Sequence, residues 1–329
     1  MSSDQLAPLV ADLHLLTVLA ATRSFTETAR RLGLSKASAS MRISELERSA
    51  GVLLVRRTTR SVGLTEAGQQ LVNSMQPAFR RISESYSAAC DLAGTPRGLI
   101  RLPAPVALGR QHLAPCIAAF LQQFPDIHIE LELTDRFVNL ANEGFDLAIR
   151  HTNAPPETHV AWVLCETRSC LAASPQYLAR RGTPTHPSGL TGHDCLLYLR
   201  DSHAGSWTFA RPGTAKGKGK AAAAAERVGV HVAGSLKANN SEVLRDALLA
   251  GLGIGLLPDF SLPALGPDGR APLVRVLPDW QVQGFFGERI YALRPWSAQV
   301  PKAVECLVAH LRQAFSAGFQ AELENTVTG

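Results

Sequence analysis

The sequence lacks any hydrophobic run long enough to cross a membrane. A bilayer-spanning helix needs about 20 consecutive apolar residues, and no stretch of the 329-residue chain approaches that length. The first residues, MSSDQLAPLV, carry an early acid and no basic cluster ahead of an apolar segment, so we expect no secretory signal. These features predict a cytoplasmic globular protein with no membrane partner, and 46% hydrophobic and 19% charged residues fit that class.

Metal-binding cysteine patterns are also missing. The six cysteines form no CxxC pair, and no histidine stands at zinc-finger spacing from such a pair, so we expect no metal site and no cofactor. Buried free thiols in a reducing compartment are the simplest interpretation. A thiol-based redox switch is the alternative, and its candidates are Cys165, Cys170 and Cys195.

The motifs of common enzyme classes do not occur. The chain has no GxSxG, P-loop or HExxH motif, and the glycines of GLGIGLLPDF do not fit GxGxxG. His193, Asp194 and Cys195 are adjacent, but neighbours in an extended segment point to opposite faces and make a poor catalytic triad. We therefore predict that the protein is not an enzyme.

Positive charge is concentrated in the first third of the chain. Residues 1–97 hold 12 of the 33 basic residues against 8 of the 28 acids, a net charge of +4, whereas residues 98–329 have a net charge of +1. An uneven surplus of this kind indicates an anionic partner for the N-terminal part.

The stretch FTETARRLGLSKASASMRIS, residues 25–44, predicts two short helices joined by a tight turn. Apolar residues at helical spacing predict a preceding helix over Asp12–Thr22. Thr26 is the expected N-cap of the second helix. Ser35 is expected to cap a third helix that ends before Gly51.

The third helix is predicted to have two different faces. Ala39, Ile43 and Leu46 share the apolar face, while its start is rich in serine and alanine. Small hydroxyl side chains let a helix end approach bases and phosphates closely, and a helix N-terminus favours a phosphate. The following VLLVRRTTRSVGLT predicts two short strands around an arginine-rich turn that would neutralise phosphates.

The segments SFTETARRLGLSKASASMRISELE and GVLLVRRTTRSVGLTEAG resemble the DNA-binding domain of LysR-type transcriptional regulators. The resemblance implies a winged helix-turn-helix domain over residues 1–64, a linker and dimerisation region over 65–98, and an effector-binding domain over 99–329. It implies double-stranded promoter DNA as a partner, a dimer or tetramer at the nucleoid, and RNA polymerase as a further candidate partner. The residues predicted to contact DNA are Ser35, Lys36, Ser38, Ser40, Arg42, Arg57, Thr59 and Arg60.

One long helix is predicted from Thr65 to about Ala93, with Pro77 kinking it or interrupting one hydrogen bond. A lone surface helix would leave its apolar stripe uncovered, so we expect the stripe to pack against a second subunit. Packing on its own domain is the alternative. A hinge follows at Gly94–Gly98. The stripe comprises Ala67, Leu71, Met75, Ala78, Ile82 and Ala89.

Beyond the hinge, alternating strands and helices predict a mainly parallel α/β fold. The segment RPGTAKGKGKAAAAAERVG is expected to be a loose β-hairpin. The family resemblance implies two subdomains like those of periplasmic binding proteins: subdomain I over 99–172 and 277–315, and subdomain II over 173–276. The chain would cross between them near Leu171–Ser174 and Leu277–Gly287. A solute receptor of the same architecture is a rival interpretation, disfavoured by the helix-turn-helix.

Candidate effector-binding residues stand at the ends of the predicted elements. Ligands of open α/β sheets bind beyond the carboxyl ends of strands and near helix N-termini. Taken singly, each candidate is as well explained by capping, and Arg150 by a salt bridge to Asp135 or Glu143. The positive N-terminal end of the predicted helix Ser241–Ala250 and the charge of Arg150 together predict a polar or anionic small-molecule effector. The candidates, placed by the resemblance, are Pro105, Val106, Thr134, Arg150, Tyr198, Asn239 and Asn240.

Overall fold

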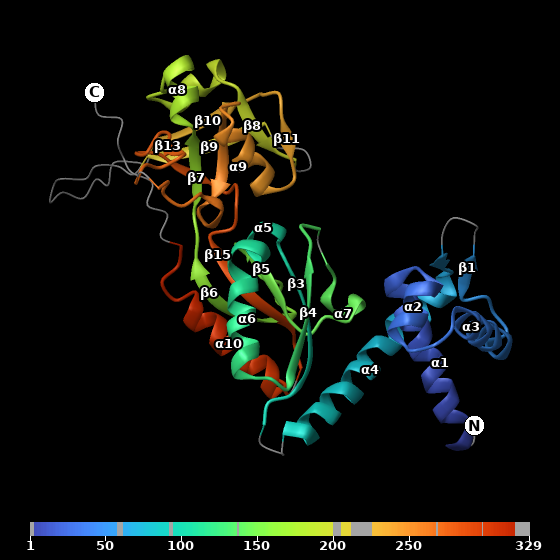
Figure 1. The fold of residues 1–329 in the computed structure, drawn as a ribbon. Helices are drawn as coiled ribbons and strands as arrows, with labels where there is room; N and C mark the ends of the chain where they lie inside the picture. Colours follow the sequence, from blue (N-terminus) through green and yellow to red (C-terminus); the bar gives the residue numbers. More distant parts are fainter. Residues whose placement is uncertain are drawn as a thin grey trace, which may run out of the picture. The chain divides into compact units, whose positions relative to one another are not determined.

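The computed structural model in Figure 1 divides into two compact units. The first comprises residues 1–98, 138–146 and 297–302, and the second comprises 99–137, 147–296 and 303–329. Among the residues that the structure describes, no helix combines the length and apolarity that a membrane span requires. Those residues are 3–57, 62–91, 95–136, 138–199, 205–211, 226–267, 269–297 and 299–319.

The first unit contains the predicted helix-turn-helix. Helix α1 starts earlier than expected, and the cap of α2 is Ser24 and not Thr26: Ser24 is extended, and its hydroxyl accepts the Glu27 N–H at 3.3 Å. Ser35 caps α3 as predicted, accepting the Ser38 N–H at 3.0 Å, and the left-handed Gly51 ends that helix. The elements are α1 (Ser3–Thr22), α2 (Phe25–Arg31), α3 (Lys36–Ala50) and the antiparallel strands β1 (Val55–Arg57) and β2 (Val62–Leu64).

The core of this domain lies between its three helices. The predicted inner face of α3 is buried, and it packs against leucines of α1 and against the wing strand β1. Thr28 is a buried polar member, and its hydroxyl bonds to the Ser24 carbonyl and the Thr22 hydroxyl, so its burial leaves no orphaned group. The fully buried residues of this core include Leu15, Leu16, Leu19, Ala39, Ile43 and Leu54.

The long helix α4 (Glu66–Asp91) continues through Pro77 as one helix. Thr65 caps it, because its hydroxyl accepts the Gly68 N–H at 3.0 Å. Gly68 permits close docking on the domain: a Cβ there would lie 2.1 Å from the Leu54 carbonyl oxygen. Val72 is 2% exposed in the same core. The first turns of α4 therefore belong to the DNA-binding domain.

The apolar stripe of α4 has two different environments. Ala67 and Leu71 are partly buried against the core of their own domain, which is the alternative packing for this part of the stripe. Further along, Ile82 is 61% and Tyr86 74% exposed. The side chain of Ala89 and residues 92–94 of the predicted hinge lie outside the described residues.

The second unit has two lobes, and the first of them, lobe I, contains two small sheets. Strand β3 pairs with β4, and the chain between them is helical from Val106 to Gln123, with a π-helical turn, η1, between α5 and α6. Gly109 lets this segment approach β4, since a Cβ there would lie 2.2 Å from Leu133 Cδ2. The short helix α7 (Leu140–Glu143) falls in the first unit. The elements of lobe I are β3 (Gly98–Ala104), α5 (Val106–Leu108), η1 (Gly109–Leu113), α6 (Ala114–Gln123), β4 (Ile127–Leu133), β5 (Ala148–Thr152), β6 (His159–Glu166), β15 (Arg289–Pro295) and α10 (Lys302–Ala314).

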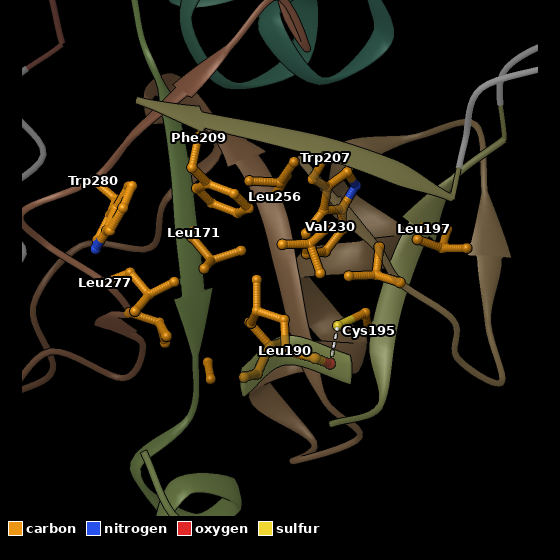
Figure 2. Packing of buried hydrophobic residues seen from close by; sticks show 14 of the residues in the cluster. Leu171, Leu190, Cys195, Leu197, Trp207, Phe209, Val230, Leu256, Leu277 and Trp280 are labelled. Atoms are coloured by element: carbon orange, nitrogen blue, oxygen red, sulfur yellow. Dashed lines mark hydrogen bonds between the residues drawn. The ribbon is translucent and has the colours of Figure 1, made fainter. Parts of the chain in front are cut away.

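Lobe II is built on a five-stranded sheet of order β11-β8-β12-β7-β13 and a three-stranded sheet of order β10-β9-β14. Its core, drawn in Figure 2, joins Leu171 of β7, Trp207 and Phe209 of β9, and Trp280, which directly precedes β14. The elements are β7 (Ser169–Ala173), α8 (Pro175–Arg181), η2 (Pro187–Gly192), β8 (Cys195–Tyr198), β9 (Ser206–Arg211), β10 (Glu226–His231), β11 (Lys237–Ala238), α9 (Ser241–Leu249), β12 (Ile254–Pro258), η3 (Asp259–Ser261), β13 (Val274–Arg275) and β14 (Gln281–Gln283).

The sheets are mixed, so the expectation of a mainly parallel fold is wrong. Strand β8 runs parallel to β11 and β12, but β7 is antiparallel to β12 and β13, and β15 is antiparallel to β5 and β6. The pairing of β15 with β6 follows from the path of the chain: one strand leaves lobe I and the other returns to it, so they run in opposite directions. The predicted β-hairpin exists as β9 and β10, while its loop, 212–225, lies outside the described residues.

The chain crosses between the lobes at 167–168, between β6 and β7, and again at 284–288, between β14 and β15. The first predicted crossing, near Leu171–Ser174, falls within and just after β7 of lobe II, whereas the second, near Leu277–Gly287, overlaps the observed segment and begins earlier, in lobe II. Leu171 belongs to β7, and Leu277 and Trp280 are buried in the core of lobe II.

Candidate DNA-binding surface and effector site

The start of α3 and the first wing strand are tied together by hydrogen bonds. Arg57 of β1 donates to the Ser40 hydroxyl at 2.9 Å and to the Ser44 hydroxyl at 3.1 Å. Its guanidinium also lies 3.6 Å from the Glu47 carboxylate and 5.1 Å from the centre of the Phe25 ring. The structure thus brings the predicted residues Ser40 and Arg57 into direct contact, in a partly exposed position.

Glu47 holds the wing against α3, a role that the sequence did not reveal. Its Oε1 accepts the backbone N–H groups of Leu54 and Val55, both at 2.9 Å. These bonds fix the start of β1 relative to α3 and so position Arg57. The local sequence pattern does not indicate this role. The partners of Glu47 lie seven and eight residues later in the chain, and a helical glutamate without nearby partners resembles an ordinary solvated residue.

The remaining predicted DNA contacts have different surroundings. Lys36 is exposed, and the hydroxyls of Ser35 and Ser38 lie 2.8 Å apart. Arg42 Nε bonds to Asp12 Oδ1 of α1 at 2.5 Å, so this arginine is held to its own domain. Thr59 and Arg60 lie outside the described residues.

Met41 is an apolar side chain on this otherwise polar surface. It is 58% exposed and stands one turn after Ser38 on α3. An exposed apolar group beside small hydroxyls is suited to contact with a thymine methyl group. Its i, i+3 spacing from Ser38 is the sequence feature that could have placed Met41 among the predicted DNA contacts.

In the second unit, Asp135 links two of the predicted effector residues from different lobes. Its Oδ1 accepts the Val106 N–H at 3.0 Å, and its Oδ2 accepts the Asn240 side-chain amide at 3.2 Å. Asn240 in turn caps α9, because its Oδ1 accepts the N–H groups of Glu242 and Val243. Asp135 follows the strand β4 directly after the predicted residue Thr134, but it is not among the predicted effector contacts, and a salt bridge to Arg150 was the role considered for it.

A second contact between the lobes lies beside the first. Glu242 Oε1 accepts the Gln111 side-chain amide at 3.0 Å, and Glu242 Oε2 lies 3.3 Å from Arg110 Nη1. His112 Nε2 lies 2.7 Å from the Phe260 carbonyl oxygen, again joining lobe I to lobe II. The carboxylates of Asp135 and Glu242 therefore both accept hydrogen bonds that join lobe I to lobe II.

The other effector candidates have separate local roles. The Thr134 hydroxyl accepts the Arg136 N–H at 3.3 Å, and Arg150 Nη1 donates to the Arg136 carbonyl at the same distance. Pro105 precedes α5 without a side-chain capping bond, and Asn239 is exposed.

Tyr198 belongs to an aromatic cluster that reaches across the lobes. Its ring centre lies 5.2 Å from that of Phe286, edge-on. Phe286 in turn stacks on His151 of lobe I, with ring centres 6.0 Å apart. The His151 ring is fixed because its Nε2 lies 2.6 Å from the Gly287 carbonyl oxygen.

The redox candidates are buried thiols. Burial raises the pKa of Cys165 and of Cys195 to about 12 and the pKa of Cys170 to about 11. Cys195 Sγ donates to the Leu190 carbonyl at 3.6 Å, a bond drawn in Figure 2. The neighbouring His193 Nδ1 instead lies 3.2 Å from the Tyr177 hydroxyl, so these two side chains have different partners. Such thiols remain protonated near neutral pH.

Two family models match the chain. Residues 10–69 match the model described as a bacterial regulatory helix-turn-helix protein of the lysR family, and residues 93–316 match the LysR substrate binding domain. The chain belongs to the LysR family of transcriptional regulators. Within the described residues of this LysR-type regulator, no three His, Cys, Asp or Glu side chains are grouped to hold a metal ion.

Relatives resemble the regulator over nearly its whole length. The transcriptional regulator PtxR of Pseudomonas aeruginosa is 33% identical over 303 residues, which cover 92% of this chain and 91% of PtxR. The transcriptional activator TtdR of Escherichia coli K12 is 29% identical over 311 residues, which cover 93% of this chain and 94% of TtdR. The full-length structure of the Vibrio cholerae virulence activator AphB is similar with a TM-score of 0.60 at 28% identity, covering 92% of this chain and 98% of AphB.

Proposed function

We propose that this LysR-type regulator binds promoter DNA through α3 and the β1–β2 wing, and that a small polar or anionic effector binds between lobes I and II. The proposed effector site comprises Val106, Asp135 and Asn240. The observation that carries it is the carboxylate of Asp135, which is held by one donor from each lobe.

The Asp135 carboxylate indicates which ligand group the donors of this site can bind. The Val106 N–H and the Asn240 amide are directed at the same group, and both are hydrogen-bond donors. An effector with a carboxylate or a comparable polar group can take over these two bonds from Asp135. Such an exchange would alter how strongly the lobes are held together and shift the population of two lobe arrangements.

The DNA-binding part of the proposal rests on small hydroxyls and positive charge at one surface. Arg57 is partly exposed beside Ser40, and Lys36 is exposed at the start of α3. Arginine and lysine at these positions suit phosphate contacts, while Ser38 and Met41 suit base contacts. We propose a dimer or tetramer as the functional form, a cytoplasmic, nucleoid-associated location, and RNA polymerase as a further partner. We also propose that the protein is a regulator without catalytic activity.

The effector site is tested by ligand screening on the full chain. We expect small organic acids and amino-acid-like metabolites to raise the melting temperature of the wild type and to act more weakly on Asn240→Ala, because one of the two donors is removed. Asn73→Ala on α4 is the matched control, since it removes an amide from the other unit. Hits that are exclusively apolar, or that stabilise Asn240→Ala as much as wild type, would show that the site is misplaced.

A redox-sensing regulator is the second candidate function. The raised pKa values of Cys165, Cys170 and Cys195 disfavour it, because oxidation proceeds through the thiolate. Metabolite sensing is therefore the function that we propose.

A further inference from the structure

A cavity of about 800 Å³ lies beside the two segments that connect the lobes. One wall is the first crossing, over 165–170, and another is the return segment with β14, over 281–289. Asp259, Arg275 and residues 316–319 complete the lining. None of the predicted effector residues is part of it, so the cavity is separate from the site at Asp135 and Asn240.

The cavity is lined by three arginines in different electrostatic situations. Arg168 lies 3.9 Å from Asp259, and Arg289 lies 3.7 Å from Glu166, so each has a carboxylate of the cavity wall nearby. Arg275 is half-buried and has no carboxylate partner among the described residues. A partly buried cation in a cavity, without a counter-ion from the chain, attracts an anion.

Asp259 does not supply that counter-ion, because its carboxylate is used within the wall. It is 5% exposed and accepts hydrogen bonds from the Thr167 hydroxyl, the Arg168 N–H at 3.1 Å and the Phe260 N–H at 2.9 Å. These bonds hold the first crossing segment to η3. Asp259 therefore shapes the cavity, and its oxygens are already satisfied.

Arg275 is fixed in place by its strand. It belongs to β13, where it pairs with Ala172 of β7, the strand that follows the first crossing. Its charge acts on this neighbourhood: burial raises the pKa of Cys170, and Arg275 opposes that rise. The remaining lining offers Gln281, Gln283 and Ser169 as hydrogen-bonding groups and the partly exposed Phe319 as apolar surface.

We propose that this cavity is a second ligand site, for a small organic anion whose carboxylate or phosphate pairs with Arg275 and whose apolar part lies against Phe319. The ligand touches both connections between the lobes at once. It therefore biases the lobe arrangement from the crossing segments, independently of a ligand at Asn240, and the two sites are coupled through the same equilibrium.

The test uses the full-length protein and three probes, benzoate, succinate and inorganic phosphate, at constant ionic strength maintained with sodium chloride. Binding is followed by calorimetry and by the melting temperature. We expect at least one probe to bind the wild type and to bind Arg275→Gln about tenfold or more weakly, because a charge-assisted pair is lost. Arg227→Gln, which removes an exposed arginine of β10, should bind like the wild type.

Further variants separate this site from the effector site and from a folding defect. Asn240→Ala should retain the Arg275-dependent response, which distinguishes failure of this inference from failure of the proposed effector site. Arg275→Lys keeps the charge but not the planar fork, and we expect intermediate affinity. Binding to succinate and benzoate alone assigns a carboxylate ligand, and binding to phosphate alone assigns a phosphate. Equal binding by wild type, Arg275→Gln and Arg275→Lys, or no probe effect beyond that of chloride, overturns the proposal.

Discussion

Single capping residues determine where the helices of this regulator begin, and they show how far sequence patterns reach. Ser35 was identified correctly, because an extended serine ahead of a helical pattern has a specific capping role. Ser24 was missed in favour of Thr26, since both residue types cap well. The choice depends on the buried Thr28, whose hydroxyl contacts Ser24 and Thr22 once the helices have packed.

The bridging role of Asp135 was not predicted, for a related reason. An aspartate after a strand is common in turns, and its partners Val106 and Asn240 are distant in sequence. Nothing in the local pattern of either segment indicates that one carboxylate joins them. The candidate residues Val106 and Asn240 were found because they stand at element ends, which is a local property.

At the residue scale, we predict that the buried thiols are inert in the native protein. With pKa values of about 11 to 12, the thiolate fraction at pH 7 is about 10⁻⁴ or less. Iodoacetamide should therefore modify Cys165, Cys170 and Cys195 only slowly at pH 7, and rapidly after denaturation. Mass mapping of the modified peptides measures this. Fast native labelling of Cys165 or Cys195 would contradict this prediction and favour the redox-sensing alternative.

At the scale of elements, the wing is the clearest case of a partial prediction. Its two short strands were predicted on either side of the arginine-rich turn in VLLVRRTTRSVGLT, and the structure has them at Val55–Arg57 and Val62–Leu64. Its attachment to α3 through Glu47 did not follow, because those hydrogen bonds depend on how the elements pack.

We predict that Arg57→Ala reduces the salt dependence of DNA binding. If Arg57 neutralises one phosphate, the slope of log K against log salt concentration should fall by about 0.9 unit. Arg60→Ala should have the same effect, and Arg227→Ala on β10 is the control with an unchanged slope. Fluorescence anisotropy titrations at several salt concentrations measure the slopes. Slopes equal to that of the wild type for both wing variants would remove the wing from the DNA contacts.

The apolar residues of α4 have different surroundings along the helix, and this decides which variant tests subunit assembly. Leu71 packs in its own domain, so a charge there would disrupt the fold itself. Ile82 is 61% exposed in the single chain, and an exposed apolar residue on a long helix is a candidate for burial between subunits.

We predict that Ile82→Glu yields monomers that remain folded, because the substitution adds charge to the proposed interface and removes nothing from the core. Sedimentation velocity gives the oligomeric state, and circular dichroism confirms folding. Gln70→Glu, on an exposed position of the same helix, is the control that should leave assembly unchanged. Intact oligomers of Ile82→Glu would place the subunit contact elsewhere.

At the scale of the whole molecule, the order of the parts was predictable and the strand directions were not. Helical and strand periodicities and the resemblance of the N-terminal segments led to a winged helix-turn-helix followed by a two-lobed α/β domain, as the family and the structure bear out. The mixed sheets and the positions of the two crossings depend on pairings between distant segments, such as β15 with β6. Local alternation carries no information on these pairings.

The central claim is that α3 of this regulator reads a DNA sequence. The most direct measurement is the ratio of dissociation constants for a genomic fragment recovered by footprinting and for its shuffled sequence, at one fixed salt concentration. We expect the wild type to prefer the genomic fragment by about 1,000-fold or more. We expect Ser38→Ala to reduce that ratio while leaving affinity for the shuffled DNA unchanged, because a base contact is lost and the phosphate contacts remain. Equal affinity of the wild type for both fragments would contradict the account.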